Sequence, residues 1–217
     1  MNILETTPTR AALLELNEER TVVNEAYEFL DEKRLLLAAE ILRQLDKFER
    51  LQVQIVALGR EASRQLIATV GRHGLQGTSV YPALQLSDTR LAVSESNYMG
   101  VMQTATELHY RLAEETEQST ACSPTAEAQG CRQAFLELTR RSAVLAGISG
   151  NLHRLIMEYR LTERRALALE NVILPEIEQT LHVMNTRLEE LDLEETVRVH
   201  LQSGQKKGNS SKGIYLR

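Results

Sequence analysis

Aromatic residues and chain breakers are scarce in this chain of 217 residues. Aromatics make up 4% of it, tryptophan is absent, and there are only 4 prolines and 11 glycines. Compact β and α/β domains draw on more bulky side chains and more turn formers, so the composition disfavours both classes. It is typical of long helices, and we expect a predominantly helical protein.

Membrane-spanning runs and cysteine frameworks are missing as well. No run of about 18 apolar residues occurs, so we expect no direct insertion into a membrane. The N-terminal residues lack the basic and apolar regions of a signal peptide, and we expect a cytoplasmic protein. Two cysteines, Cys122 and Cys131, are too few for a disulfide framework or a metal site.

Residue patterns typical of catalysis or cofactor binding are also absent from the sequence. Phosphate-binding glycine loops are missing, and the five histidines are scattered rather than paired on a helix. The 25 Lys and Arg against 30 Asp and Glu give a formal charge of −5, which disfavours nucleic-acid binding. We therefore expect no enzyme activity in this chain, no metal ligands, no cofactor and no nucleic-acid partner.

A seven-residue repeat of apolar residues, called here the N-terminal seam, dominates the first part of the chain. A surface helix drifts away from a strict seven-residue repeat because 3.6 residues complete a turn, so a repeat this long predicts a left-handed coiled coil. One column contains Leu13, Tyr27, Ile41, Phe48 and Ile55, and the other contains Leu16, Val23, Leu30, Leu37, Leu51 and Leu58.

Three polar residues interrupt the N-terminal seam: Arg20, Arg34 and Gln44. A charge in a coiled-coil seam lowers stability unless it is paired or its side chain reaches solvent. Two interpretations of the arginines stay open. They pair with acidic residues across the coil, or they form a basic spot that faces a surrounding partner.

A second apolar seam in the C-terminal part alternates spacings of three and four from Leu145 to Ile173. The spacing then slips at Ile177 and resumes beyond it, which locally unwinds a coiled coil. Pro175, which removes a helix hydrogen bond, lies at the same place. The coincidence indicates either a bend that serves a function or a tolerated kink without one.

These patterns divide the chain into four segments. Residues 1–70 form an N-terminal coiled-coil helix, capped by Thr7 with Pro8 in its first turn and stopped by Gly71, Gly74 and Gly77. Residues 71–125 form a small middle domain with a β-hairpin and a short helix over 106–119. Residues 126–201 form the C-terminal coiled-coil helix, and the two long helices pair antiparallel.

Residues 202–217 form a basic, glycine- and serine-rich tail that we expect to be flexible. It is either a disordered end or a basic tip that contacts an acidic partner surface. A structural or tethering coiled-coil adaptor would share the heptads of this chain, and this class of function stays open as the alternative to the one introduced next.

Three motifs, in order along nearly the whole chain, resemble those of a known family. They are Pro8-Thr9-Arg10 followed by Leu13-Leu14 and by LDEKRL at 30–35, then NYMGV at 97–101, and RALALENVILPEIEQT at 165–180. The combination is similar to the D subunit of the V-type and A-type rotary ATPases, the central rotor stalk. The acidic residues Glu18, Glu19 and Glu25 depart from the family's basic first helix, and ETVRVH at 195–200 replaces its aromatic and basic ending.

The resemblance implies a non-catalytic subunit that transmits torque and couples ATP hydrolysis or synthesis to proton or sodium transport. It implies four partners: the A and B subunits of a catalytic hexamer, the F subunit, and the C (d) subunit on the membrane ring. A rod that turns inside such a hexamer is expected to carry charged outer faces. The residues that we expect to contact the hexamer are Arg10, Arg20, Lys33, Arg34, Arg165, Asn171 and Pro175.

Overall fold

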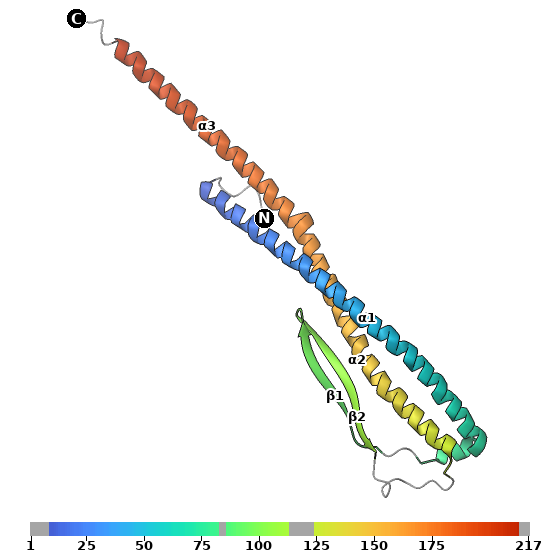
Figure 1. The fold of residues 1–217 in the computed structure, drawn as a ribbon. Helices are drawn as coiled ribbons and strands as arrows, with labels where there is room; N and C mark the ends of the chain where they lie inside the picture. Colours follow the sequence, from blue (N-terminus) through green and yellow to red (C-terminus); the bar gives the residue numbers. More distant parts are fainter. Residues whose placement is uncertain (1–8, 83–85, 113–123, 213–217) are drawn as a thin grey trace. The chain divides into compact units, whose positions relative to one another are not determined.

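The computed structural model describes residues 9–82, 86–112 and 124–212 (Figure 1). Helix α1 covers Arg10–Val80, strands β1 and β2 cover Leu86–Tyr98 and Val101–Leu112, and helix α2 covers Ala126–Ala168. A short π-helix, η1, covers Leu169–Ile173, and helix α3 covers Leu174–Lys212. The prediction of a helical protein with a small β-hairpin in its middle is confirmed.

The chain forms two compact units, each containing a part of α1 and a part of the C-terminal helices. The terminal unit consists of residues 1–32 and 162–217, and the hairpin unit consists of residues 33–161. None of the helices in the described ranges is both long enough and apolar enough to cross a membrane.

In the terminal unit, the start of α1 is paired with α3, and an ion pair between Arg10 and Asp192 joins the two helices. The C-terminal seam is confirmed here at Thr162, Ala166, Ile177, Leu181 and Met184, which are all buried, whereas its member Ile173 is exposed. The facing members of the N-terminal seam, from Leu13 to Leu30, are partly buried. Burial of one stripe on each helix is the packing of a two-stranded coiled coil.

The slip in the C-terminal seam corresponds to the π-helix η1. The backbone N–H of Leu174 donates to the carbonyl oxygen of Leu169, five residues earlier, so this turn holds one more residue than an α-helical turn. Pro175 follows directly and has no N–H to donate. The wider turn also relieves the clash between the proline ring and the carbonyl group of Asn171, four residues earlier.

In the hairpin unit, α1 and α2 pair antiparallel around a small apolar core. Leu37 and Leu155 are both 0% exposed and pack with the buried Val101 of β2. Ile41, Tyr98, Met99 and Tyr159 surround these three residues. An ion pair between Lys33 and Glu158 lies toward one end of the unit, and one between Arg72 and Glu127 lies toward the other, which fixes the antiparallel direction.

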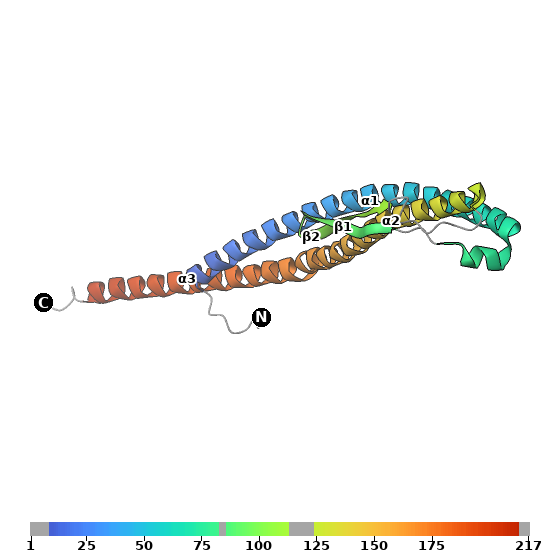
Figure 2. The same cartoon turned by 90° about the horizontal axis from the view of Figure 1, so that it is seen from below.

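The two strands form a long hairpin that lies along α2 in two views at right angles (Figures 1 and 2). Its turn is Met99-Gly100, where both residues have positive φ angles of 51° and 86°, as a type I′ turn requires. The side-chain oxygen of Asn97 accepts a hydrogen bond from the N–H of Gly100 and closes the turn. The motif NYMGV is therefore the tip of the hairpin.

Several predicted boundaries were wrong by part of a segment. Helix α1 continues past residue 70 to Val80, although Gly74 breaks it with a φ angle of 71°. The N-cap is Thr9, whose hydroxyl oxygen accepts from the N–H of Ala12, and Thr7 and Pro8 lie outside the described residues. Helix α3 extends to Lys212, so the expected flexible tail is helical over 202–212.

The short helix predicted over 106–119 was also wrong, because residues up to Leu112 belong to strand β2. Burial there has the period of two that a strand requires: Thr106, Leu108 and Tyr110 are partly buried, and the residues between them are exposed. Residues 113–119 lie outside the described part of the chain.

Candidate partner-binding surface

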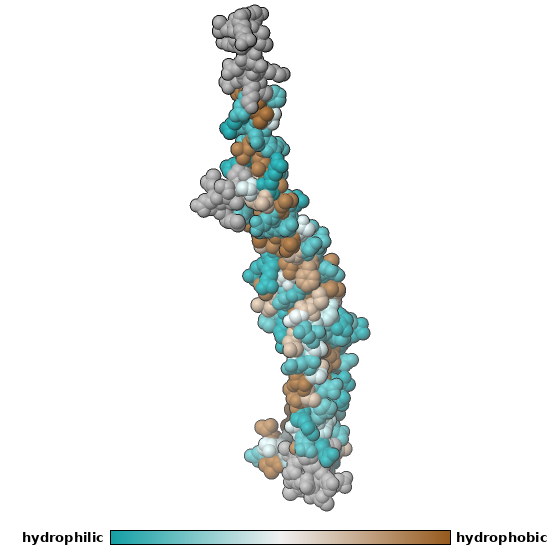
Figure 3. All heavy atoms as spheres, turned by 90° about the vertical axis from the view of Figure 1, so that its left-hand side faces the viewer, coloured by the Kyte–Doolittle hydropathy of each residue, from teal (hydrophilic) through white to brown (hydrophobic). Residues whose placement is uncertain are grey.

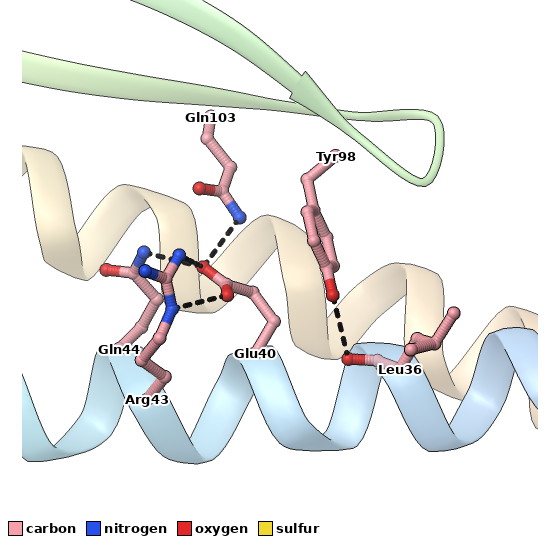
Figure 4. A network of polar contacts seen from close by, with 6 residues as sticks. All are labelled: Leu36, Glu40, Arg43, Gln44, Tyr98 and Gln103. Atoms are coloured by element: carbon pink, nitrogen blue, oxygen red, sulfur yellow. Dashed lines mark hydrogen bonds and ion pairs between the residues drawn. The ribbon is translucent and has the colours of Figure 1, made fainter.

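A buried carboxylate on α1 anchors the hairpin near its tip. Arg43 donates two hydrogen bonds to Glu40, from Nε to Oε2 and from Nη2 to Oε1, each 2.7 Å long. Gln44 on α1 donates to Oε1 at 2.8 Å, and Gln103 on β2 donates to the same oxygen at 3.1 Å (Figure 4). The four residues, called here the Glu40 cluster, therefore join α1 to the hairpin.

The Glu40 cluster keeps its carboxylate ionised although Glu40 is only 4% exposed. Burial by itself raises the pKa of Glu40, but the hydrogen bonds from Arg43, Gln44 and Gln103 and the charge of Arg43 outweigh it. The pKa of Glu40 falls from 4.5 to about 2. The same contact with Glu40 raises the pKa of Arg43. The cluster is thus charged throughout the physiological range of pH.

A second set of hydrogen bonds joins β2 to α2. The N–H of Thr104 donates to Oδ1 of Asn151 at 2.8 Å, and Nδ2 of Asn151 donates to the carbonyl oxygen of Thr104 at 2.8 Å. Arg154 donates to Oδ1 of Asn151 and to the hydroxyl oxygen of Thr104. The amide side chain of Asn151 therefore satisfies the backbone of Thr104 as a neighbouring strand would.

Close approach of the hairpin to α2 depends on a glycine. The hydroxyl of Thr106 donates to the carbonyl oxygen of Ala143 at 2.6 Å, over the surface of Gly147. A Cβ atom on Gly147 would collide with the side chain of Thr106. Side chains on α1 and α2 together thus hold the hairpin in one place within this unit.

Two of the basic residues expected at a hexamer interface form ion pairs across the coil. Arg10 binds Asp192 in the terminal unit at 3.0 Å, where both side chains are well exposed. Lys33 binds Glu158 in the hairpin unit at 2.6 Å, and these side chains are 15% and 25% exposed. Basic residues of the N-terminal helix therefore do pair with acidic residues across the coil at Arg10 and Lys33.

The remaining expected contact residues lie on the helix surfaces. Arg20 is exposed and has no hydrogen bond or ion pair with another described residue, whereas Arg34 is half-buried. Arg165, Asn171 and Pro175 are exposed around η1. The side-chain amide of Asn171 donates to the carbonyl oxygen of Leu167 at 3.1 Å and so supports the π-helical turn. Five of the seven residues belong to the terminal unit, and Lys33 and Arg34 belong to the hairpin unit.

The outer faces of the helices are less charged than expected. Figure 3 shows apolar side chains interspersed with polar ones on the face that it presents. Residues one or two heptads apart, such as Leu35, Leu42 and Val56 on α1, are exposed. On α3, Leu193, Val197 and Leu201 form a second exposed stripe beyond the Arg10–Asp192 pair and line a groove there. Contiguous exposed apolar surfaces are common where proteins bind one another, so these residues are candidates for partner contacts.

Sequence reasoning missed the residues that hold the hairpin. Gln44 was noticed as a break in the N-terminal seam, but its role was not. Glu40, Arg43 and Gln44 share one helical face at spacings of three and four, and this spacing is the signal that a polar cluster lies inside the coil. Asn151 and Gly147 carry no such signal, because their role depends on a strand that lies about 45 residues earlier.

Long paired helices, a π-helix beside a proline and a hairpin held on α1 and α2 define a coiled-coil class of protein. The sequence pattern of the ATP synthase D subunit family matches residues 12–202. The chain belongs to this family, and it is a component of a V-type or A-type rotary ATPase. The predicted resemblance is confirmed.

Named relatives agree along most of their length. The chain is 28% identical to a V-type ATP synthase D subunit of Thermotoga neapolitana, covering 88% of this chain and 94% of the relative. It is 28% identical to an A-type ATP synthase D subunit of Methanopyrus kandleri, over 88% and 83%. A V-type proton ATPase D subunit of Neurospora crassa is 23% identical, over 79% and 65%.

Proposed function

We propose that this chain is the central-stalk rotor of its ATPase. It turns inside a hexamer of A and B subunits and transmits torque to or from the ion-translocating ring of the membrane. Rotation couples ATP hydrolysis or synthesis to the transport of protons or sodium ions. The chain itself is non-catalytic and lies on the cytoplasmic side, peripheral to the membrane.

The observation that carries this proposal is that ion pairs join the two paired helices in both units. A single helix twists and bends easily, whereas two helices tied side by side resist both motions. The ties are Arg10–Asp192 in the terminal unit, and Lys33–Glu158 and Arg72–Glu127 in the hairpin unit. Each joins residues far apart in sequence, so torque applied to one helix passes to its partner.

Exposed stripes on the helices support contacts with the other subunits. On α3, the stripe Leu193, Val197 and Leu201 lies beyond the Arg10–Asp192 pair, and its helix has no paired helix there among the described residues. We assign this stripe, together with Arg10, Arg20 and Arg34, to contacts with the hexamer. Exposed apolar residues of the hairpin unit, such as Leu42, are assigned to the F subunit or the C (d) subunit.

We assign the surface around η1 to the hexamer as well. Arg165 offers a positive charge there, while Asn171 and Pro175 shape the π-helical turn that interrupts the regular coil. Because the π-helical turn lies on only one of the two helices, the surface of the coil differs from one side to another. Such asymmetry lets one stalk act differently on each of the surrounding catalytic interfaces. Lys33, in the hairpin unit, is assigned to the hexamer contacts too, and its pair with Glu158 fixes the position of its charge.

Single-molecule observation of the assembled ATPase tests the rotor. A bead is attached through a cysteine placed at the exposed Gln76 of α1, in a background with Cys122→Ser, while the hexamer is fixed to the surface. Addition of ATP is expected to drive rotation of the bead in one direction. ATP hydrolysis without rotation of the bead contradicts the proposal and favours a static tethering role. A bead on the fixed hexamer is the control.

A further inference from the structure

The hairpin has two edges, and they differ in what pairs with them. A two-residue type I′ turn makes Tyr98 and Val101 exchange hydrogen bonds, so the next pair, Asn97 and Met102, points its backbone groups outward. The alternation continues to the pair Glu95 and Thr104. The hydrogen bonds between Thr104 and Asn151 confirm this assignment independently, because they need outward backbone groups.

The register therefore names the outward groups on β1. They belong to Asn97, Glu95, Val93 and Leu91, and the pairing is regular as far as Arg90, where a bulge begins. On β2, the outward edge faces α2 (Figure 1) and is satisfied at Thr104 by Asn151. On β1, no hydrogen bond joins the outward backbone groups to other residues in the described ranges.

The free edge of β1 carries few of the features that usually prevent pairing with another chain. Edge strands are commonly protected by proline, lysine, bulges or short length. Between Leu91 and Asn97 there is no proline, no lysine and no bulge, and the only charged side chain is that of Glu95. The exposed backbone groups are therefore ready to accept a strand.

Side chains next to this edge are apolar and incompletely covered. Leu91 and Val93 are 52% and 51% exposed. They lie on the same face of the hairpin as their partners Leu108 and Thr106, which are partly buried. An added strand with apolar residues on that face would extend the covered surface over both side chains.

We propose that the edge of β1 from Leu91 to Asn97 binds an extended strand of another subunit of the complex. The strand has alternating apolar residues that cover Leu91 and Val93, and it carries no acidic residue opposite Glu95. A second copy of this chain fits poorly. Symmetric pairing about Val93 sets Glu95 opposite Leu91, and pairing about Glu95 sets two carboxylates together. This inference does not rest on rotation, so a static complex would leave it intact.

Residue-resolved amide hydrogen exchange tests the proposal on the full chain, alone and in the assembled complex. Outward amides of Leu91, Val93, Glu95 and Asn97 are expected to exchange at least about tenfold more slowly in the complex. The inward amides of Ala92, Ser94 and Ser96 already bond to β2, so their exchange is expected to change little. Unchanged exchange of the outward amides on assembly overturns the proposal.

A matched pair of variants separates the backbone edge from the side chain. Val93→Pro removes one outward N–H that the hairpin itself does not use, whereas Val93→Ala keeps it. In the complex, Val93→Pro is expected to abolish the slower exchange at Leu91 and Glu95, and Val93→Ala is expected to retain it. If Val93→Pro loosens the hairpin, shown by faster exchange at Ala92 in the isolated chain, Glu95→Pro replaces it.

Measurements on the isolated chain identify other occupants of the edge. Slow exchange of the outward amides that grows with protein concentration would show that a second copy binds there. Slow exchange at every concentration would show that the chain covers its own edge. Either result overturns the proposal that another subunit supplies the strand.

Discussion

Gln103 of strand β2 donates a hydrogen bond of 3.1 Å to the buried carboxylate of Glu40 on helix α1. This contact joins residues 63 positions apart and places a charge inside the coil beside the tip of the hairpin. The carboxylate is stable there because Arg43, Gln44 and Gln103 all donate to it. The hairpin is thus fixed to α1 by a polar contact whose strength depends on the ionisation of one residue.

Acid is expected to weaken this contact. The pKa of Glu40 is lowered to about 2 in the folded protein, so its stabilising effect is complete above its unfolded pKa near 4.5. As the pH falls from there through 2, the folded protein is expected to lose on the order of 3 kcal/mol from this group. Urea unfolding measured over this range of pH, followed by circular dichroism, gives the free energy.

The variant Glu40→Gln supplies the comparison. It is expected to be less stable than the wild type at pH 7 and to show a flatter dependence of stability between pH 4.5 and 2. Glu49→Gln, at an exposed position of the same helix, is expected to follow the wild type. Equal slopes for Glu40→Gln and the wild type would mean that the cluster does not hold Glu40 ionised.

Two glycines three residues apart on α2 are expected to respond oppositely to alanine. Gly147→Ala places a methyl group against Thr106 and is expected to destabilise the protein by about 1–3 kcal/mol. Gly150→Ala meets only the flexible side chain of Arg154 at 3.6 Å and is expected to stabilise it by up to about 1 kcal/mol, as alanine favours a helix. Thermal unfolding measures both.

The difference between these variants locates the effect. If close packing of the hairpin on α2 is the cause, Gly147→Ala also speeds amide exchange in strand β2, while Gly150→Ala does not. Similar stabilities for the two variants would contradict the close approach of Thr106 to α2.

Exchange of charges between Lys33 and Glu158 tests how much their ion pair stabilises the pairing of α1 with α2. Each side chain is mostly buried, so Lys33→Glu or Glu158→Lys alone is expected to cost about 3 kcal/mol or more, because it sets like charges together. The double variant restores an opposite pair and is expected to recover most of this loss. Removal of the exposed Arg10–Asp192 pair by Arg10→Ala is expected to cost less than about 1 kcal/mol.

Urea unfolding of the four forms gives the coupling energy of the pair. A coupling energy near zero would show that Lys33 and Glu158 act independently. The least exposed of the three ion pairs would then contribute nothing to the stiffness of the paired helices. Arg10→Ala serves as the control for loss of a basic residue from the same helix.

Sequence periodicity was sufficient for the long helices and for both seams. Leu30, Leu37 and Leu51 lie on one face of their helix, and a coiled coil buries that face against any partner helix. The heptad pattern alone therefore predicts which face of the helix is buried. The slip at Ile177 predicted a local unwinding of the helix, and η1 lies just before it. An extra residue in a heptad has to be accommodated within a turn or two of the helix.

Non-local contacts were beyond the reach of the pattern. Residues 106–112 read as helix, although alternation at Thr106, Leu108 and Tyr110 fits a strand packed on α2. Whether that alternation forms a strand depends on Asn151 and Gly147, which lie far away in sequence. The helix does break at Gly74, but the predicted stop at residue 70 was wrong because α1 resumes after the break, and nothing in the glycine spacing predicts this.

The π-helix offers a test of whether the interruption near Pro175 serves a function. Deletion of Val172, which is exposed, removes the extra residue and turns η1 into α-helix. With Pro175 retained, its ring would clash with a carbonyl group four residues earlier, and a loss of about 3 kcal/mol is expected. With Pro175→Ala added, the helix becomes regular, and stability is expected to equal or exceed that of the wild type.

The stable double variant then isolates function from folding. If the interruption sets the asymmetry of the stalk, the assembled ATPase is expected to hydrolyse ATP with less ion transport per ATP. The ratio of ion transport to ATP hydrolysis in reconstituted vesicles measures this, with Pro175→Ala alone as the control that keeps the extra residue. An unchanged ratio in the double variant would show that the interruption is a tolerated kink, because a regular coil would then transmit torque equally well.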